Sequence, residues 1–406
     1  MKRILLDSER QDMKKRMWFV RVIALVIAMM LAGAGSGFAL YWIGTGGNAL
    51  WSNGNNWSLY SGGGAAETSP GAGDVAIFDL GSGAFRNITV DAEIAAPGVT
   101  IQITNVTGGI SITVDALLTL AADTSVDLTT AANSLAFYFG AGSIALAGNA
   151  TFDVASGTEV SSSETINNAG GNLTFKGDGN FNFSGVISGS NQVIKEGSGT
   201  LKLTGNNAFT GIVTLSAGTL LINGTHTNAA TGDITVASGA TLGGTGTIKS
   251  HVIVNGTVKP GDPSVASGVG TLTTSTAGGE GNVTFNPGSY LTVDNNNTSY
   301  DVLAVGGTLS LQTDNTAFIT LETGESYSTS NKVVTAVTYD IAKKFKTTSL
   351  PVNWSITQTA DSGVWLTYTN LIIPTLNEWG IIIMLLLLTG TGILVMRKRQ
   401  YTGGVA

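Results

Sequence analysis

The chain has 406 residues, of which 55 are Gly, 7 are Pro and none is Cys, and 12% of its residues are charged while 43% are apolar. Gly and Pro together are too few for collagen or a low-complexity chain, and a disordered chain carries more charge and fewer apolar residues. The net charge of −7 argues against nucleic acid as a partner, because affinity for phosphate backbones comes mainly from Lys and Arg. The many Gly residues predict tight turns between short strands.

The first 39 residues have the layout of a secretory signal. Seven Lys and Arg residues fall within the first 21 positions, an apolar run follows over residues 22–32, and small residues lead up to Ala39. We therefore expect residues 1–39 to form a signal helix and signal peptide that is cut after Ala39. An uncleaved N-terminal membrane anchor is the alternative, and in both cases the middle of the chain is exported.

The exported body is more acidic than the whole chain. Residues 40–371 keep 10 of the 20 Lys and Arg and 23 of the 27 Asp and Glu, so their net charge is −13. This charge favours solubility and disfavours anionic partners. Because the body has no Cys, its stability has to come from its core and its backbone hydrogen bonds.

Residues 96–325 show the pattern of short strands. Runs of four to seven residues with period-two alternation recur between Gly, Asn, Ser and Asp turns, which predicts an all-β structure. A Gly-Thr-apolar triplet recurs at residues 199–201, 218–220, 246–248, 256–258, 270–272 and 307–309, with a variant at 240–242. Steps near twenty residues predict the coils of a solenoid, and shorter steps predict triplets on different faces of one coil. Stacked coils bury apolar side chains that a single coil leaves exposed, so we expect ladders of like residues along the axis.

Both ends of the predicted solenoid need a cap. Residues 40–95 form a Trp-rich entry module in which Trp42, Trp51 and Trp57 fall within sixteen positions. Their flat rings suit the stacking of sugar rings, but we favour packing against the open end of the core. Residues 326–371, with two further Trp residues, are predicted to be closing strands.

The body offers few residues for catalysis or for metal binding. Its two His residues, His226 and His251, are expected on the surface, and without Cys the chain lacks the parts of zinc sites and of Cys- or His-based nucleophiles. The run from Asp178 begins like a calcium loop but lacks the Gly and the Glu that such a loop needs. We therefore predict no catalytic residue, no cofactor and no metal. A polysaccharide-active β-helix enzyme, a lyase or glycosidase, is the alternative, with Glu159 and Glu164, or Asp74 and Asp79, as carboxylate pairs in the sequence.

Part of the body resembles the autotransporter-associated β-strand repeat of bacterial surface passengers. The resemblance lies in residues 195–211, 217–220, 239–248 and 256–261. It covers residues 192–310 well and implies a right-handed parallel β-helix. The Trp-rich entry module resembles the N-terminal module of the same proteins. The carboxyl end departs from this group, because an apolar span and a basic triplet stand where an autotransporter has its translocating domain.

The carboxyl end has the pattern of a single transmembrane helix. Residues 380–396 are apolar and lie between Trp379 and the basic triplet at 397–399. Seventeen residues at about 1.5 Å each span roughly 26 Å, close to the ~30 Å of a hydrocarbon core. The basic residues favour a cytoplasmic tail.

Residues 372–406 are similar to the IPTL-type C-terminal sorting signal. The matching positions are Ile373, Pro374, Thr375, Leu376, Trp379 and Gly380. The resemblance implies processing by an exosortase, a membrane-embedded transpeptidase-like enzyme that transfers proteins to the cell surface. Pro374 keeps the preceding residue extended, which suits a segment that an enzyme must reach. A plain membrane anchor is the alternative.

These features and resemblances imply a non-enzymatic structural or adhesin-like protein at the cell surface or envelope of a Gram-negative-type bacterium. It is expected to be membrane-anchored or released after processing. The expected partners are an exosortase-type enzyme, the membrane before processing, and surface polysaccharide or other cells, but not nucleic acid. A carbohydrate-binding surface protein that uses Trp42, Trp51 and Trp57 is a further alternative.

Overall fold

Nearly all regular structure of the described residues is β-strand, with one short 3₁₀ helix, η1 (Gly54–Asn56). The computed structural model describes residues 39–42, 54–59, 70, 74–79, 86–90, 100–104, 110–114, 118–120, 124–128, 143–227, 233–265, 268–277, 281–294, 299–312, 317–321, 331–339, 345–347, 350, 354–359 and 363–368. None of the helical structure in these ranges is long and apolar enough to cross a membrane. The predicted signal up to residue 38, the apolar span 380–396 and the sorting residues lie outside them.

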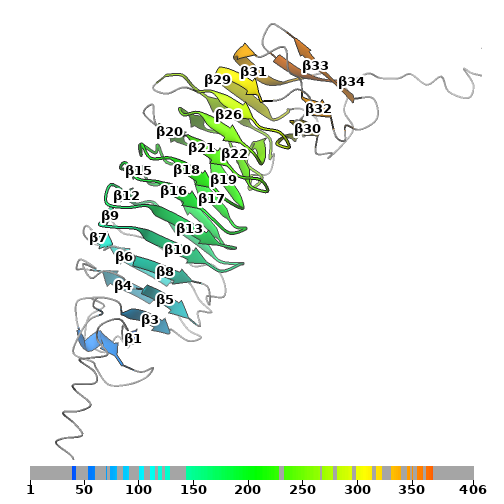
Figure 1. Ribbon diagram of the computed structural model, residues 1–406. Coiled ribbons are helices and arrows are strands. Elements are labelled where there is room, and N and C mark those ends of the chain that lie inside the picture. The colour runs from blue at the N-terminus through cyan, green and yellow to red at the C-terminus, as the bar shows by residue number, and fades with distance from the viewer. Residues whose placement is uncertain are drawn as a thin grey trace, which may run out of the picture.

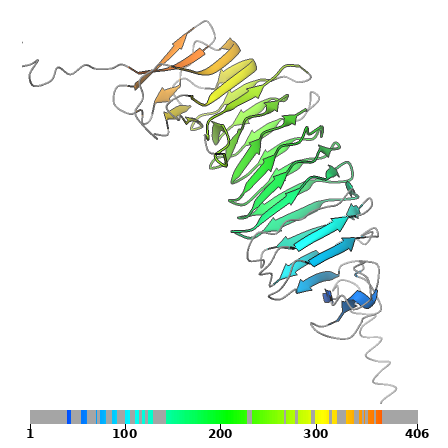
Figure 2. The same cartoon turned by 180° about the vertical axis from the view of Figure 1, so that it is seen from behind.

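The strands coil into an elongated stack, with β1 near one end and β33 and β34 at the other (Figure 1). Along the stack, each strand pairs in parallel with the matching strand one coil before and one coil after it, for example β13 with β10 and β16. The view from behind shows the same layered arrangement (Figure 2). The chain therefore folds as a parallel β-solenoid, as its periodicity predicts.

The first sheet runs through most of the stack. Its parallel strands are β1 (Ala39–Trp42), β3 (Val75–Asp79), β5 (Thr100–Thr104), β8 (Thr124–Leu128), β10 (Ala150–Val154), β13 (Leu173–Gly177), β16 (Val193–Lys195), β18 (Val213–Leu215), β21 (Ile234–Val236), β24 (Val252–Val254), β27 (Val283–Phe285), β29 (Val302–Leu311) and β31 (Asn331–Tyr339).

The second sheet follows the first in each coil. Its strands are β11 (Glu159–Ser162), β14 (Asn180–Phe183), β17 (Thr200–Leu203), β19 (Thr219–Ile222), β22 (Thr241–Gly244), β25 (Thr257–Pro260), β28 (Tyr290–Val293), β30 (Phe318–Leu321) and β32 (Lys346–Thr347). Nearer the N-terminus, β4 (Arg86–Val90) and β6 (Ile110–Val114) pair with each other.

The third face completes each coil. Its first strands are β7 (Leu118–Leu120), β9 (Ser143–Leu146), β12 (Thr165–Asn167) and β15 (Ile187–Ser188). It continues with β20 (Thr225–His226), β23 (Thr247–Ile248), β26 (Thr271–Thr274) and the first half of β29.

The core is made of ladders in which like residues stack one coil above the other. In the second sheet the buried ladder consists of Val160, Phe181, Leu201, Leu220, Leu242, Val258, Leu291 and Ile319. Burying each such side chain contributes about 1.5–3 kcal/mol. One coil alone has no partner for this apolar row, so the stacking itself creates the core.

The register explains the Gly-Thr-apolar triplet. Thr200, Thr219, Thr241 and Thr257 stand in one column at the start of successive strands of the second sheet, while Thr247 pairs on the third face. In each triplet Thr faces outward and the next residue faces the core. The prediction that the short steps fall on different faces is therefore confirmed.

In the coils of β17 and β19, a glycine just before the strand turns the corner of the coil. Gly218 has φ of +70°, and a Cβ there would lie 2.4 Å from the carbonyl oxygen of Gly197, one coil earlier. Gly197 itself has φ of +73°. Only glycine combines this backbone conformation with so close an approach of neighbouring coils.

The ends of the stack depart from the parallel pattern. β34 (Gly363–Tyr368) pairs antiparallel with β31 and with β33 (Trp354–Thr359), so a hairpin ends the described stack. At the other end β2 (Trp57–Ser58) pairs antiparallel with β1. Such pairing occupies strand edges that would otherwise be open.

Candidate interaction surface

The predicted stacking residues do not form a described sugar platform. Trp57 is 0% exposed and belongs to the core, so its ring cannot receive a sugar. Its inclusion among the candidate stacking residues is therefore wrong, and its burial agrees with the alternative that it closes the core. Trp42 stands opposite Trp57 in the β1–β2 register, and Trp51 lies outside the described residues. Ala39, the predicted cleavage position, is the first residue of β1 and pairs with Val75.

Between Glu159 at one end and Phe318 and Lys346 at the other, the outer face of the second sheet carries an uncharged polar column. It runs through Asn180, Thr200, Thr219, Thr241, Thr257 and Tyr290, all at least partly exposed. The first two are linked, because the Oδ1 of Asn180 accepts the backbone N–H of Thr200 at 3.0 Å. This column offers hydroxyl and amide groups in a row with one strand spacing, roughly 4.8 Å, between them.

The column ends in an aromatic pair. The rings of Tyr290 and Phe318 are stacked with their centroids 5.1 Å apart, and Tyr290 is 37% exposed. The Nζ of Lys346, next in register, lies 5.9 Å from the centre of the Phe318 ring. Both faces of Phe318 therefore have a neighbour, and the pair stabilises the stacking of three coils.

Beside this column an inserted segment, described at residues 261–265 and 268–270, leaves β25 and lies across the outer face of earlier coils. Gly261 and Gly244 exchange two backbone hydrogen bonds of 2.7 and 2.9 Å in an antiparallel bridge. Leu221 points outward on β19, between the inward Leu220 and Ile222, yet it is only 3% exposed. The sheet is therefore covered here.

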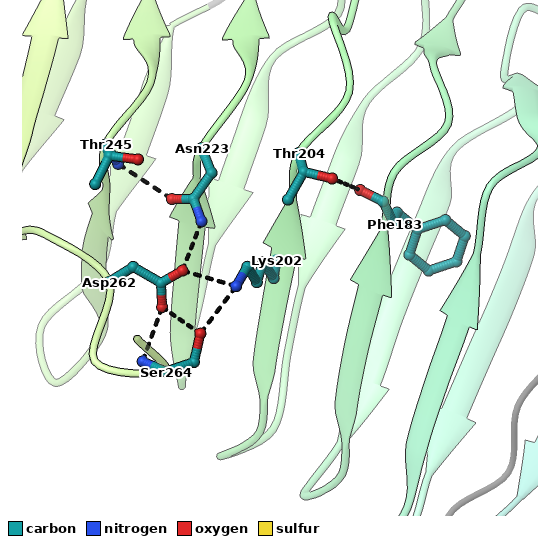
Figure 3. Close-up of polar contacts among 7 residues, drawn as sticks. All are labelled: Phe183, Lys202, Thr204, Asn223, Thr245, Asp262 and Ser264. Carbon is teal, nitrogen blue, oxygen red and sulfur yellow. Dashed lines mark hydrogen bonds and ion pairs between the residues drawn. The ribbon is translucent and has the colours of Figure 1, made fainter. Parts of the chain in front are cut away.

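Asp262 is the polar centre of this segment. Figure 3 shows Lys202, Asn223 and Ser264 converging on its carboxylate. The Nζ of Lys202 lies 2.7 Å from Oδ2, and Asn223 donates to the same oxygen at 2.6 Å. Ser264 donates to Oδ1 through its backbone at 2.9 Å and its hydroxyl at 2.6 Å. Burial alone would raise the pKa of Asp262, but these hydrogen bonds lower it to about 2.

Asp301 holds the other end of the inserted segment. Its Oδ1 accepts the backbone N–H of Gly270 at 2.8 Å, and its Oδ2 accepts that of Asp294 at 2.9 Å. The residue is fully buried, and burial raises its pKa to about 7 against these two hydrogen bonds. Asp294 also pairs with Lys259 on β25 at 3.3 Å.

The described carboxylates do not assemble a catalytic or metal-binding cluster. Glu159 accepts a hydrogen bond from Ser161, and Glu164 accepts one from Ser163, so each is bonded within its own segment. The carboxylate of Asp262 forms an ion pair with Lys202. Across the described ranges, no group of three His, Asp or Glu side chains is arranged to bind a metal.

One of the two His residues differs from the expected surface position. His226 is 1% exposed, contacts Phe209 at 4.5 Å between ring centres, and neither ring nitrogen has a hydrogen-bond partner. Burial lowers its pKa to about 4. His251 is partly exposed and lies near Asp233 and Thr284. The surface prediction is wrong for His226 because a position in a buried ladder, next to Ile248, decides its environment.

The side-chain amine of Lys195 is buried at the end of β16. Lys195 ends β16 on the core side, and its Nζ donates to the carbonyl oxygens of Glu196 at 2.6 Å and Gly197 at 2.9 Å. Burial lowers the pKa of Lys195 to about 8. The side chain thus satisfies two corner carbonyls that the turn leaves without strand partners.

Comparison with known proteins supports the repeat. The passenger-associated transport repeat matches residues 193–222, from β16 to β19. The adhesin BmaC autotransporter of Brucella suis biovar 1 (strain 1330) is 45% identical over 93 residues, which are 22% of this chain and 3% of that protein. The chain thus aligns with only a small part of this relative. It contains a passenger-type β-repeat, as its resemblance in residues 192–310 implies.

Sequence reasoning missed the inserted segment and its partners. The available signal is the spacing: Val252 pairs with Val283, 31 positions later, whereas Val193 pairs with Val213, 20 positions later. Pro260 ends β25 and Pro263 lies among the extra residues, and two Pro residues so close together indicate a loop. Nothing in the spacing shows where that loop lies.

Proposed function

We propose that this chain is an exported, surface-sorted and non-enzymatic β-helical protein that contributes to cell adhesion or to an extracellular matrix. The observation that carries the proposal is the passenger repeat at residues 193–222 within a continuous stack of coils. Adhesion is the property in the printed name of the Brucella relative. Right-handed coiling is part of the proposal, because nearly all connections between parallel strands of one sheet have that hand.

The lateral surface supports binding better than catalysis. Enzymes of the β-helix class need convergent acids and bases on one face. On the second sheet the outward column from Asn180 to Tyr290 carries no ionisable acid or base apart from the Tyr hydroxyl, and the buried Asp262 is already paired with Lys202. A polar surface of this kind forms many weak contacts with surface polysaccharide or with other cells.

Delivery to the surface is proposed to depend on both ends of the chain. A signal peptide that ends at Ala39 starts export, and the motif from Ile373 to Gly380 directs an exosortase-type enzyme to the protein while residues 380–396 hold it in the membrane. The mature protein is then anchored or released after processing.

Fractionation of cells tests the sorting step. The double variant Pro374→Ala with Trp379→Ala alters two fixed positions of the motif, and Asn377→Ala with Glu378→Ala alters the two variable positions as a matched control. We expect the first variant to stay with the inner membrane and the control to reach the surface. Surface delivery of both would rule out exosortase sorting and leave a plain anchor.

Attachment assays test the adhesive role separately. Cells that display the chain are compared with cells that lack it, on abiotic surfaces, on polysaccharide films and on other cells. We expect a loss of attachment without the chain, and equal attachment would contradict adhesion. The surface-extracted protein is also incubated with the same polysaccharides, since release of new reducing or unsaturated ends would favour the enzyme alternative.

A further inference from the structure

We propose that the inserted segment, described at residues 261–265 and 268–270, is a clasp that ties five consecutive coils together along the outside of the second sheet. The five coils are those of β17, β19, β22, β25 and β28, which are neighbours in the sheet. An ordinary β-solenoid joins each coil only to the next one. The clasp adds contacts that skip over coils.

The first half of the clasp reaches backward. Asp262 follows β25, yet its carboxylate binds Lys202 on β17, three strands earlier, at 2.7 Å. On the way it accepts the side-chain N–H of Asn223, whose Oδ1 in turn accepts the backbone N–H of Thr245 at 3.1 Å. Every coil from β17 to β25 therefore contributes one group to the same chain of hydrogen bonds (Figure 3).

The second half is held from the forward direction. Asp301 follows β28 and accepts the N–H of Gly270, 31 positions before it in the sequence. The pair between Lys259 and Asp294, at 3.3 Å, spans the same two coils. The segment is thus fixed at both ends by carboxylates from different coils.

The coils beneath the clasp have residues that fit its closed position. A Cβ at Gly243 would lie 3.4 Å from the carbonyl oxygen of Gly261, the first residue of the segment. Leu221 itself is an apolar residue at an outward position of β19, and it is only 3% exposed.

The clasp affects how easily neighbouring coils separate and how the stack responds to a pull along its axis. Lys202 and Asp262 are 60 positions apart, so the clasp closes only after three later strands have stacked. A single coil then cannot separate from its neighbour without also breaking the Asp262 network. If the chain is an adhesive rod, as proposed above, the clasp resists a pull along the axis where the passenger repeat lies.

Hydrogen exchange on the full-length, surface-extracted protein tests this inference. Asp262→Asn and Lys202→Met each remove one side of the ion pair, and Asp153→Asn removes an exposed ion pair with Lys176, at 3.4 Å, as the matched control. We expect amide exchange in β19, β22 and β25 to become about ten- to a hundredfold faster in the first two variants, because each leaves a buried or half-buried charge without its ionic partner. Exchange in β10 and β13 is expected to stay the same, and the control is expected to change neither region.

Two results would overturn the clasp. Unchanged exchange in β19 and β22 would show that the segment adds nothing to these coils, and equal acceleration in β10 and β13 would show a general loss of stability. If Asp262→Asn does not fold, Ser264→Ala is used instead, because it removes only the hydroxyl between Lys202 and Asp262. The same increase of exchange in β19, β22 and β25 is then expected. Exchange does not depend on adhesion, so a failed attachment assay with a positive exchange result rejects the proposed function and keeps the clasp.

Discussion

Asp262 and Asp301 hold opposite ends of one inserted segment, and their surroundings move their pKa values in opposite directions. Both are buried, which favours the neutral acid. Asp262 has the cation of Lys202 and three further hydrogen bonds, which outweigh burial and bring its pKa to about 2. Asp301 receives two backbone N–H groups, and burial prevails there with a pKa of about 7. One end of the segment is therefore charged at neutral pH, while the other titrates near it.

The first prediction concerns the pH dependence that Asp301 creates. Its carboxyl holds a proton in the native state up to about pH 7, whereas its usual pKa is 3.8. The native state therefore binds more protons between these values, and the free energy of unfolding falls as pH rises from about 4 to 7, by at most about 4 kcal/mol. In Asp301→Asn this fall should disappear. Denaturant midpoints, followed by circular dichroism from pH 4.5 to 8, measure it, and identical slopes in both proteins would contradict the assignment.

The second prediction concerns His226, whose effect has the opposite sign. Its usual pKa of 6.5 is lowered to about 4 in the native state, so the unfolded chain binds more protons between these values. The free energy of unfolding therefore falls by up to about 3 kcal/mol as pH drops through this window. His226→Leu removes this loss and two ring nitrogens without partners. We expect a stabilised protein, more so at pH 5 than at pH 7.5.

The wild-type profile combines the two effects. Because Asp301 and His226 act in opposite directions over nearly the same range, each variant should reveal the slope of the other. The double variant should be flatter than either single one. A His226→Leu protein that is less stable at pH 5 than the wild type would show that the imidazole has a polar role in the core.

The third prediction separates backbone strain from crowding at the corners. Gly218 and Gly239 both have positive φ, +70° and +84°, but a Cβ at Gly239 meets nothing within 4 Å, while at Gly218 it lies 2.4 Å from two carbonyl oxygens. Gly239→Ala should cost about 1–2 kcal/mol for the left-handed conformation alone. Gly218→Ala should cost clearly more, because two coils must move apart. If thermal unfolding shows the same loss of stability in both variants, the backbone at the Gly218 corner can shift to make room for the added Cβ.

The fourth prediction compares a core ring with a surface ring. Phe175 is fully buried and lies 5.1 to 6.0 Å from three other Phe rings between centroids. Phe175→Ala should destabilise its coils by about 3–5 kcal/mol. Phe318→Ala loses mainly the stacking with Tyr290 and should cost roughly 1 kcal/mol. Urea denaturation with exchange measured near each site would check both, and a large loss for Phe318 would show that the aromatic pair holds the end of the stack.

The architecture could be predicted because it depends on local patterns that repeat. Gly218 and Thr219 carry their corner and outward roles in the sequence itself, and the neighbouring Leu220 faces inward by alternation alone. The repeat then brings Thr219 beside Thr200 and Thr241 without further information. Local rules of this kind apply to each coil in the same way.

The burial of individual polar residues could not be predicted in this manner. Lys195 and His226 occupy ladder positions that belong to the core, and their residue types favour the surface. The contact between Lys202 and Asp262 depends on where a loop lies after three more strands have formed. This contact is not part of the pattern that recurs from coil to coil, so the periodicity of the sequence gives no signal for it.

Coil length varies in this protein while strand register does not. Ile234 pairs with Val252 after 18 positions, and Val252 pairs with Val283 after 31, yet both pairs continue the same ladder. Additional residues at a corner therefore change the outline of the molecule, whereas an additional coil changes its reach by a fixed step of about 4.8 Å. A gene that gains or loses one coil adjusts the distance between the two ends of the molecule and keeps every remaining core contact.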